Sequence, residues 1–355
     1  MSAWAPLALT SLTAALLALP VTPALFELWK RADAAPLPTS RHDGRIGNFA
    51  EVFRSRLHPL LPQLEQCRNQ RELSRVSMEG MEVLLVGRDD FDFDPRLTEG
   101  ISAVMLSEAA LIPPGYVVEA DVYTGIGLDL GECAALRAAL CEGDIILGEN
   151  SAVLRWLHAD GSIFLRRGSN AYGRLSAGRS IRLEPECGFE RMSAPQITTV
   201  DTDQRDDSPP QRDVRELQPA DVCDRFASSR PRLRIQGNFV LPAGETLNAN
   251  VIATGELRLA AGARLFGSAK SYKDTVIDED ACVHGSIVSG ETARLGPRCF
   301  VAGPLMAESN VLIARGSRVG GPDALTTISS DGVRIAAGCH LHGTVWARVR
   351  GSVEA

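Results

Sequence analysis

Hydrophobic and polar positions alternate along most of the chain, and the alternation repeats about every 18 residues. With Phe239 at position 1, FVLPAGETLNANVIATGE is followed in the same frame by LRLAAGARLFGSAKSYKD, and the frame continues to Ala347 with an insertion before Val333. Odd positions are apolar or small and even positions are largely polar, which is the two-residue period of a strand with one buried face. Position 3 is always leucine or isoleucine, at Leu241, Leu259, Ile277, Leu295, Ile313 and Ile335.

The same frame fits an earlier block that begins at Ala110. Its first unit is ALIPPGYVVEADVYTGIG, and position 3 is again aliphatic, at Ile112, Leu130, Leu147, Leu165 and Leu183. Between the blocks, residues 196–232 break the columns and contain DTDQRDDSPPQRD, so we interpret this stretch as an exposed loop or linker. The sequence leaves open whether the two blocks stack end to end or lie side by side.

An 18-residue unit with three short strands predicts one coil of a narrow, triangular β-helix. Position 11 is mostly glycine, and we expect it to permit turn conformations that other residues avoid. In the unit with the insertion, the frame assigns position 13 to Asp323. One coil buries too few aliphatic side chains to offset the entropy lost in ordering its backbone, so the coils must stack. The predicted fold class is all-β, a β-solenoid in two blocks.

The N-terminal segment is apolar, with no charged side chain in the first 26 residues. Residues 3–29 are long enough to cross a bilayer, which takes about 20 apolar residues. Lys30 and Arg31 follow directly, so the positive-inside rule predicts a single-pass anchor in a bacterial inner membrane with the bulk of the chain in the cytoplasm. The alternative is a signal peptide cleaved near Ala24, although the basic region that opens such peptides is missing.

Short helices are expected after this segment, between Asn48 and Glu72, because Phe49, Val52, Phe53 and Leu57 follow helical spacing. The predicted organisation is an anchor at 1–31, a linker with short helices at 32–82, solenoid block 1 at 83–195, a polar linker at 196–232 and solenoid block 2 at 233–355.

Composition narrows the classes of function. The net charge of −7 argues against a nucleic-acid binder, which would carry a clustered basic face. The eight cysteines form no C-x-x-C pair, and their scatter along a long chain favours a reducing compartment over a disulfide framework. Neither a phosphate-binding loop nor a nucleophile elbow is present, and we expect no cofactor, no metal and no catalytic residue.

The repeat itself resembles a known family. LRLAAGARLFGSA and VRIAAGCHLHGTVWA are similar to the repeat of the bactofilins, polymer-forming cytoskeletal proteins, and ALIPPGYVVEADVYT matches it more loosely. The resemblance covers about Ala110 to Ala347 without the interruption. It implies a right-handed β-helix that polymerises end to end without nucleotide, often on the inner membrane, as a platform for cell-envelope and cell-shape machinery. The N-terminal anchor, the two blocks and the long internal loop depart from the family's simplest form.

The coil ends are the expected sites of self-assembly, because terminal coils expose unpaired strand edges. The residues after Trp346 are too few to form a substantial cap, so we expect the C-terminal end to be free for contact. The candidate contact residues are Phe239, Leu341, Val345 and Trp346. The expected partners are other copies of the chain, the inner membrane through residues 3–29 and envelope-biogenesis proteins that the sequence does not name.

Two other classes remain open. Acyltransferases with hexapeptide repeats also use 18-residue coils, in a left-handed β-helix, but three equivalent hexapeptides do not fit this frame. They also need a general-base histidine, whereas His158, His284, His340 and His342 lie at even, outward positions. Cys339 points inward and His340 and His342 outward, which disfavours a shared zinc ion. The second alternative is an exported β-helix that binds polysaccharide, and membrane topology separates it from the scaffold.

Overall fold

The computed structural model describes residues 4–19, 22, 46–88, 91, 93, 95–201 and 230–354. The chain divides into two compact units, residues 1–45 and 46–355. The first contains helix α1 (Trp4–Ala18), and no helix in the described ranges is long and apolar enough to span a membrane. The expected anchor over residues 3–29 lies partly outside these ranges.

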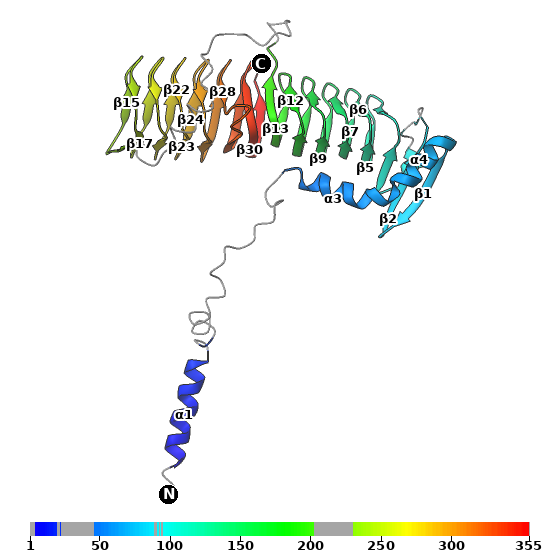
Figure 1. The fold of residues 1–355 in the computed structure, drawn as a ribbon, viewed down its shortest axis with the longest axis horizontal. Coiled ribbons are helices and arrows are strands. Elements are labelled where there is room, and N and C mark those ends of the chain that lie inside the picture. Colours follow the sequence, from blue (N-terminus) through cyan, green and yellow to red (C-terminus); the bar gives the residue numbers. More distant parts are fainter. Residues whose placement is uncertain are drawn as a thin grey trace. The chain divides into compact units, whose positions relative to one another are not determined.

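The second unit is a β-solenoid of about 13 turns of roughly 18 residues (Figure 1). Successive coils pair in parallel, so that Ile163 lies beside Ile181 and Leu257 beside Thr275, each pair 18 residues apart. The predicted 18-residue coil is therefore confirmed. Its inward columns are closed to solvent: Leu130, Leu147 and Leu165 are each at most 1% exposed.

The N-terminal half of the second unit consists of short helices, a β-hairpin and the coils of block 1. Its helices are α3 (Asn48–Leu57), the 3-10 turn η2 (His58–Leu60), α4 (Leu61–Gln70) and the short α5 (Pro95–Thr98). Its strands are β1 (Leu73–Met78), β2 (Met81–Val86), β3 (Ala103–Leu106), β4 (Ala110–Ile112), β5 (Val117–Thr124), β6 (Gly127–Leu130), β7 (Ala135–Cys141), β8 (Asp144–Leu147), β9 (Ala152–Ala159), β10 (Ile163–Leu165), β11 (Asn170–Ala177), β12 (Ser180–Leu183) and β13 (Gly188–Thr199).

Block 2 has three short strands in most coils. They are β14 (Arg232–Ile235), β15 (Phe239–Leu241), β16 (Thr246–Leu247), β17 (Asn250–Ala253), β18 (Leu257–Leu259), β19 (Arg264–Leu265), β20 (Ala269–Ser271), β21 (Thr275–Ile277), β22 (Cys282–Val283), β23 (Ile287–Ser289), β24 (Thr292–Leu295), β25 (Phe300–Val301), β26 (Leu305–Ala307), β27 (Asn310–Ile313), β28 (Arg318–Val319), β29 (Thr326–Ile335) and β30 (His340–Val353). The linker expected at 196–232 is shorter at both ends, and residues 202–229 lie outside the described ranges.

Two details of the repeat differ from expectation. At position 11, Gly343 has a φ of +110°, as expected, but Gly267 and Gly285 do not have positive φ; a Cβ on Gly267 would instead lie 2.1 Å from the Ala249 carbonyl oxygen. Glycine is needed at position 11 here because neighbouring coils approach closely. In the coil with the insertion, Ile328, not Asp323, pairs with Leu305 and is buried. The insertion bulges out, and the chain re-enters the column five residues later.

Helices α3 and α4 cover one face of block 1. Phe53 packs edge-on against Trp156 of β9, with ring centroids 5.2 Å apart, and Leu57 and Leu64 are also buried there. The predicted short helices are thus present. Their buried face differs in part, because Phe49 and Val52 are 46% and 53% exposed.

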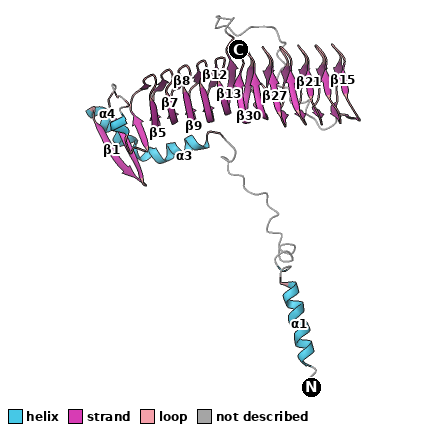
Figure 2. Cartoon of the chain, turned by 180° about the vertical axis from the view of Figure 1, so that it is seen from behind, coloured by secondary structure: helices cyan, strands magenta, loops and turns pink. Residues whose placement is uncertain are grey.

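The two blocks stack end to end, with the second running back toward the first. The last strand of block 1, β13, pairs antiparallel with the last strand of the chain, β30. In Figure 1 the red β30 lies beside the green β13, and β15 lies at the far end of block 2. Figure 2 shows the same order from behind. The C-terminal coil is therefore in the middle of the solenoid.

Candidate assembly site

The junction between the blocks is an antiparallel ladder whose register shifts at two places, between Phe189 and Arg191 and between Ala194 and Ile197. Met192 lies opposite Val345 and Ile197 opposite Leu341, and all four side chains are at most 1% exposed. Gly351 lies opposite Phe189, and a Cβ at this glycine would fall 2.1 Å from the phenyl ring. The junction thus has the dry, close packing of a protein core.

Polar contacts surround this core. The Thr199 hydroxyl donates to the Ala336 carbonyl oxygen at 2.7 Å and accepts from the Cys339 backbone N–H at 2.9 Å. Asp201 forms an ion pair with Arg315. The Arg191 guanidinium lies 4.3 Å from the ring centroid of Trp346. These contacts join residues more than 100 positions apart, so the junction is specific as well as apolar.

The structure places three of the four candidate contact residues in this junction. Leu341 and Val345 are buried against β13, and Trp346 stacks with Arg191 at its rim. The expectation of a free C-terminal end is wrong, because block 1 covers that end within the same chain. Phe239 is the one candidate located elsewhere, at the opposite end of block 2.

Phe239 belongs to the terminal coil formed by β14, β15 and β16, which we name the open coil. Each of its strands pairs on one side only among the described strands, with β17, β18 and β19. Of its inward side chains, Leu241 is 5% exposed, but Ile235, Phe239 and Leu247 are only half-buried, whereas Leu257, Leu259 and Leu265 in the next coil are fully buried. The open coil thus presents an incompletely covered core and three unpaired strand edges.

At the other end of the solenoid the apolar core is covered, although the end strand β1 pairs with β2 alone among the described strands. Hairpin β1–β2 pairs with β3 through β2, and Phe93 lies in the core at 3% exposure with Phe91 packed edge-on against it. Helix α4 covers the hairpin, with Leu64 and Cys67 buried. Among the described coils, the open coil is therefore the uncovered end.

A polar network lies beneath the start of α3. His158 Nδ1 is 2.7 Å from Ser176 Oγ, His158 Nε2 is 3.1 Å from Asp160, and Arg54 of α3 binds both Asp160 oxygens at 2.7 and 2.8 Å. Sequence reasoning treated His158 as a solvated surface residue and missed this network. It points outward as predicted, but α3 covers it.

The serine, histidine and aspartate of this network have the order of a nucleophile, a base and an orienting acid. Ser176 is only 8% exposed, and Gly47 stands over it, 3.8 Å from Ser176 Oγ at the position of a Cβ. Burial lowers the pKa of His158, an effect that Asp160 partly opposes. Because α3 covers the serine and Arg54 neutralises the aspartate, the arrangement serves to attach the helix to the solenoid.

The cysteines are free thiols in the described part of the chain. Burial raises the pKa of Cys141 and Cys339 to about 11 and that of Cys299 to about 12, so these groups are protonated at neutral pH. Among the described residues, no group of three or more His, Cys, Asp or Glu side chains could hold a metal ion. Cys339, His340 and His342 are not brought together as ligands, and His342 Nδ1 lies 2.9 Å from the Pro195 carbonyl oxygen instead.

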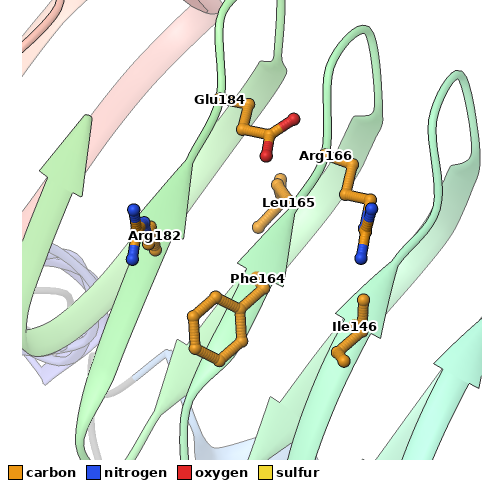
Figure 3. A pocket seen from close by; sticks show the side chains of 6 residues that line it. All are labelled: Ile146, Phe164, Leu165, Arg166, Arg182 and Glu184. Carbon is orange, nitrogen blue, oxygen red and sulfur yellow. The ribbon is translucent and has the colours of Figure 1, made fainter. Parts of the chain in front are cut away.

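One shallow pocket lies on the outer surface of block 1 (Figure 3). Ile146, Phe164 and Arg182 stand side by side on β8, β10 and β12, and Arg166 and Glu184 border them at the turn. Glu184, the one carboxylate at the pocket, accepts a hydrogen bond from the Arg167 backbone N–H.

Comparison of the chain with protein-family models, curated proteins and solved structures finds no match.

Proposed function

We propose that this protein is a structural scaffold that pairs with a second copy of itself through the open coil and holds envelope-related partners along its solenoid. The apolar N-terminal segment would attach the pair to a membrane, as the bactofilin-like repeat also suggests. The observation that carries the proposal is the asymmetry of the solenoid ends: one is closed by a hairpin and helices, whereas Phe239 and Leu247 are half-buried at the other.

The junction between the two blocks supports the proposal that solenoid ends of this chain pair with each other. There, two solenoid ends of this chain join by antiparallel strands over a buried apolar layer. Two open coils related by a two-fold axis could pair in the same way, since strand edges associate unless they are covered. With one end closed, this association stops at a dimer and does not extend into a filament. The end-to-end polymer implied by the family resemblance is therefore not the form that we propose.

Analytical ultracentrifugation of the full chain in a mild, non-denaturing detergent tests the proposal. We expect a concentration-dependent dimer for the wild type and a monomer for Phe239→Asp, because a charge in the apolar contact would lose its solvation. Val240→Asp is the matched control, since Val240 is on the same strand but points outward and is 56% exposed. A wild-type monomer, or equal dimerisation of both variants, would refute the proposal.

A further inference from the structure

A second surface feature arises from the way the blocks join. The outward residues of one face form a single row that crosses the junction, through Phe164, Arg182, Thr198, His340, Arg318 and Phe300, and continues past Cys282 to Arg264. We name this row the arginine–aromatic stripe. At about 4.8 Å per coil, its seven steps from Phe164 to Arg264 span roughly 34 Å.

The stripe combines cationic and aromatic groups on a flat, open surface. Arg182, Arg264 and Arg318 are exposed. Phe300 is half-buried between Arg318 and Arg264, and Phe164 is half-buried at the end of the row, next to Arg182. Beside the row, the rings of Phe266 and His284 stack at 4.4 Å with an interplanar angle of 5°, and Phe300 meets His284 edge-on at 5.9 Å. The three rings thus contact one another from coil to coil beside this part of the row.

Two arginines of the stripe, Arg264 and Arg318, differ from other arginines of block 2 in their ion pairs. Arg258 pairs with Asp278, and Arg298 with Asp280. Arg264 and Arg318 have no carboxylate within salt-bridge distance in the part of the chain that the structure describes. His340, next to Arg318 in the row, has a pKa lowered by burial and then by Arg318 and His342, all of which disfavour added positive charge. The stripe is thus a locally positive surface on a protein of net charge −7.

Neutral hydrogen-bonding groups separate the charges. Ser162 and Ser180 lie beside Phe164 and Arg182, with their hydroxyls 3.0 Å apart, and Thr198 occupies the row at the junction. The arginines are therefore sparse, and hydroxyl groups lie among them. A nucleic acid carries a phosphate at every nucleotide and calls for denser positive charge. A hydroxyl-rich chain with occasional carboxylates fits this spacing better.

We propose that the arginine–aromatic stripe binds a linear anionic glycan, with guanidinium groups on its carboxylates and aromatic rings against its sugar rings. Arginine suits this role because its planar fork matches a carboxylate with two parallel hydrogen bonds. The stripe lies along the side of the solenoid, so an extended polymer can follow it across both blocks without blocking the open coil.

The binding of polygalacturonate to the full chain, measured by affinity gel electrophoresis and by microscale thermophoresis, tests this proposal. We expect the double variant Arg264→Gln/Arg318→Gln to bind about tenfold more weakly or worse, because each lost charge-assisted bond weakens the complex. The control Arg258→Gln/Arg294→Gln removes the same charge from a different face and should bind within about twofold of the wild type. Sedimentation of each variant checks that dimerisation is unchanged.

The other outcomes would overturn the proposal. Absence of polygalacturonate binding by the wild type would refute it, and so would equal weakening by the two double variants, which would reveal general charge attraction only. If an oligothymidylate bound more tightly than polygalacturonate, and Arg264→Gln/Arg318→Gln abolished that binding, the ligand of the stripe would be single-stranded nucleic acid and not a glycan.

Discussion

Met192 and Val345, 153 residues apart in sequence, lie opposite each other in an antiparallel ladder and are both buried. One belongs to the last coil of block 1 and the other to the last coil of the chain. This pair shows that the second block runs back toward the first, so that the free end of the solenoid is the beginning of block 2. The location of the open coil and the course of the arginine–aromatic stripe both depend on this reversal.

Charging the junction should therefore destabilise the whole solenoid. In Val345→Asp a carboxylate would be buried among apolar side chains, and we expect the free energy of unfolding to fall by about 3 kcal/mol or more. Urea unfolding followed by circular dichroism measures the change. Val349→Asp on the same strand is the control, since Val349 is 72% exposed and its variant should stay within about 0.5 kcal/mol of the wild type. Equal stability of both variants would contradict the observed junction.

The close contact between Gly351 and Phe189 offers a double-mutant test of the same interface. Gly351→Ala places a methyl group against the phenyl ring and should lower the free energy of unfolding by about 1–3 kcal/mol, the usual effect of overpacking. Phe189→Ala removes the ring and should cost about 3–5 kcal/mol by itself. In the double variant the methyl group occupies vacated space, so the combined loss should be smaller than the sum. Additive losses would indicate that the two residues are not in contact.

Two half-buried histidines predict a pH dependence of stability. Burial lowers the pKa of both His158 and His340 below the unfolded value of about 6.5. Between the folded and unfolded pKa values the unfolded chain binds more protons, so the stabilising contribution is complete above about pH 6.5 and is lost as the pH falls through this value. Thermal unfolding at about pH 8 and about pH 5.5 should show this loss.

The control for this effect is His340→Gln, which removes one of the two titrating groups. The loss of stability between the two pH values should be smaller in His340→Gln than in the wild type. An identical pH dependence in both proteins would show that His340 does not contribute.

Chemical labelling of the Cys133 thiol in cells tests whether the solenoid lies in the cytoplasm or is exported. This thiol is exposed at a turn, whereas Cys141 and Cys187 are buried. If Lys30 and Arg31 direct the bulk of the chain to the cytoplasm, a membrane-impermeant maleimide should label Cys133 only after the inner membrane is permeabilised. The test uses a Cys223→Ser background, because Cys223 lies outside the described residues, and adding Cys133→Ser to it should remove most of the signal. Labelling in cells with an intact inner membrane would instead show an exported solenoid. A cytoplasmic solenoid would meet glycans before their export, and an exported one would meet finished glycans.

The repeating coil could be predicted from sequence because each inward column is a local pattern that recurs. Leu241, Leu259 and Ile277 share position 3 and are all buried as expected. The frame even places Val345 inward correctly. It cannot show what covers that residue, because the end of a solenoid has the same alternation whether it meets solvent, a second molecule or another part of its own chain.

The polar network was missed for a related reason. His158 is at an outward position, which the two-residue period identifies as a surface residue. The period of a strand reveals its two faces but not which neighbouring element lies over the outer one. The pairing of Arg54 with Asp160 spans 106 residues, and neither residue belongs to a local motif.

Negative-stain electron microscopy of the full chain in detergent tests the central claim most directly. About 13 coils at roughly 4.8 Å each make a solenoid of roughly 60 Å, and two joined at their open coils would measure roughly 120 Å. We predict particles of this doubled length for the wild type and of the single length for Phe239→Asp. Filaments of indefinite length, or single-length particles in the wild type at micromolar concentration, would contradict the proposed pairing.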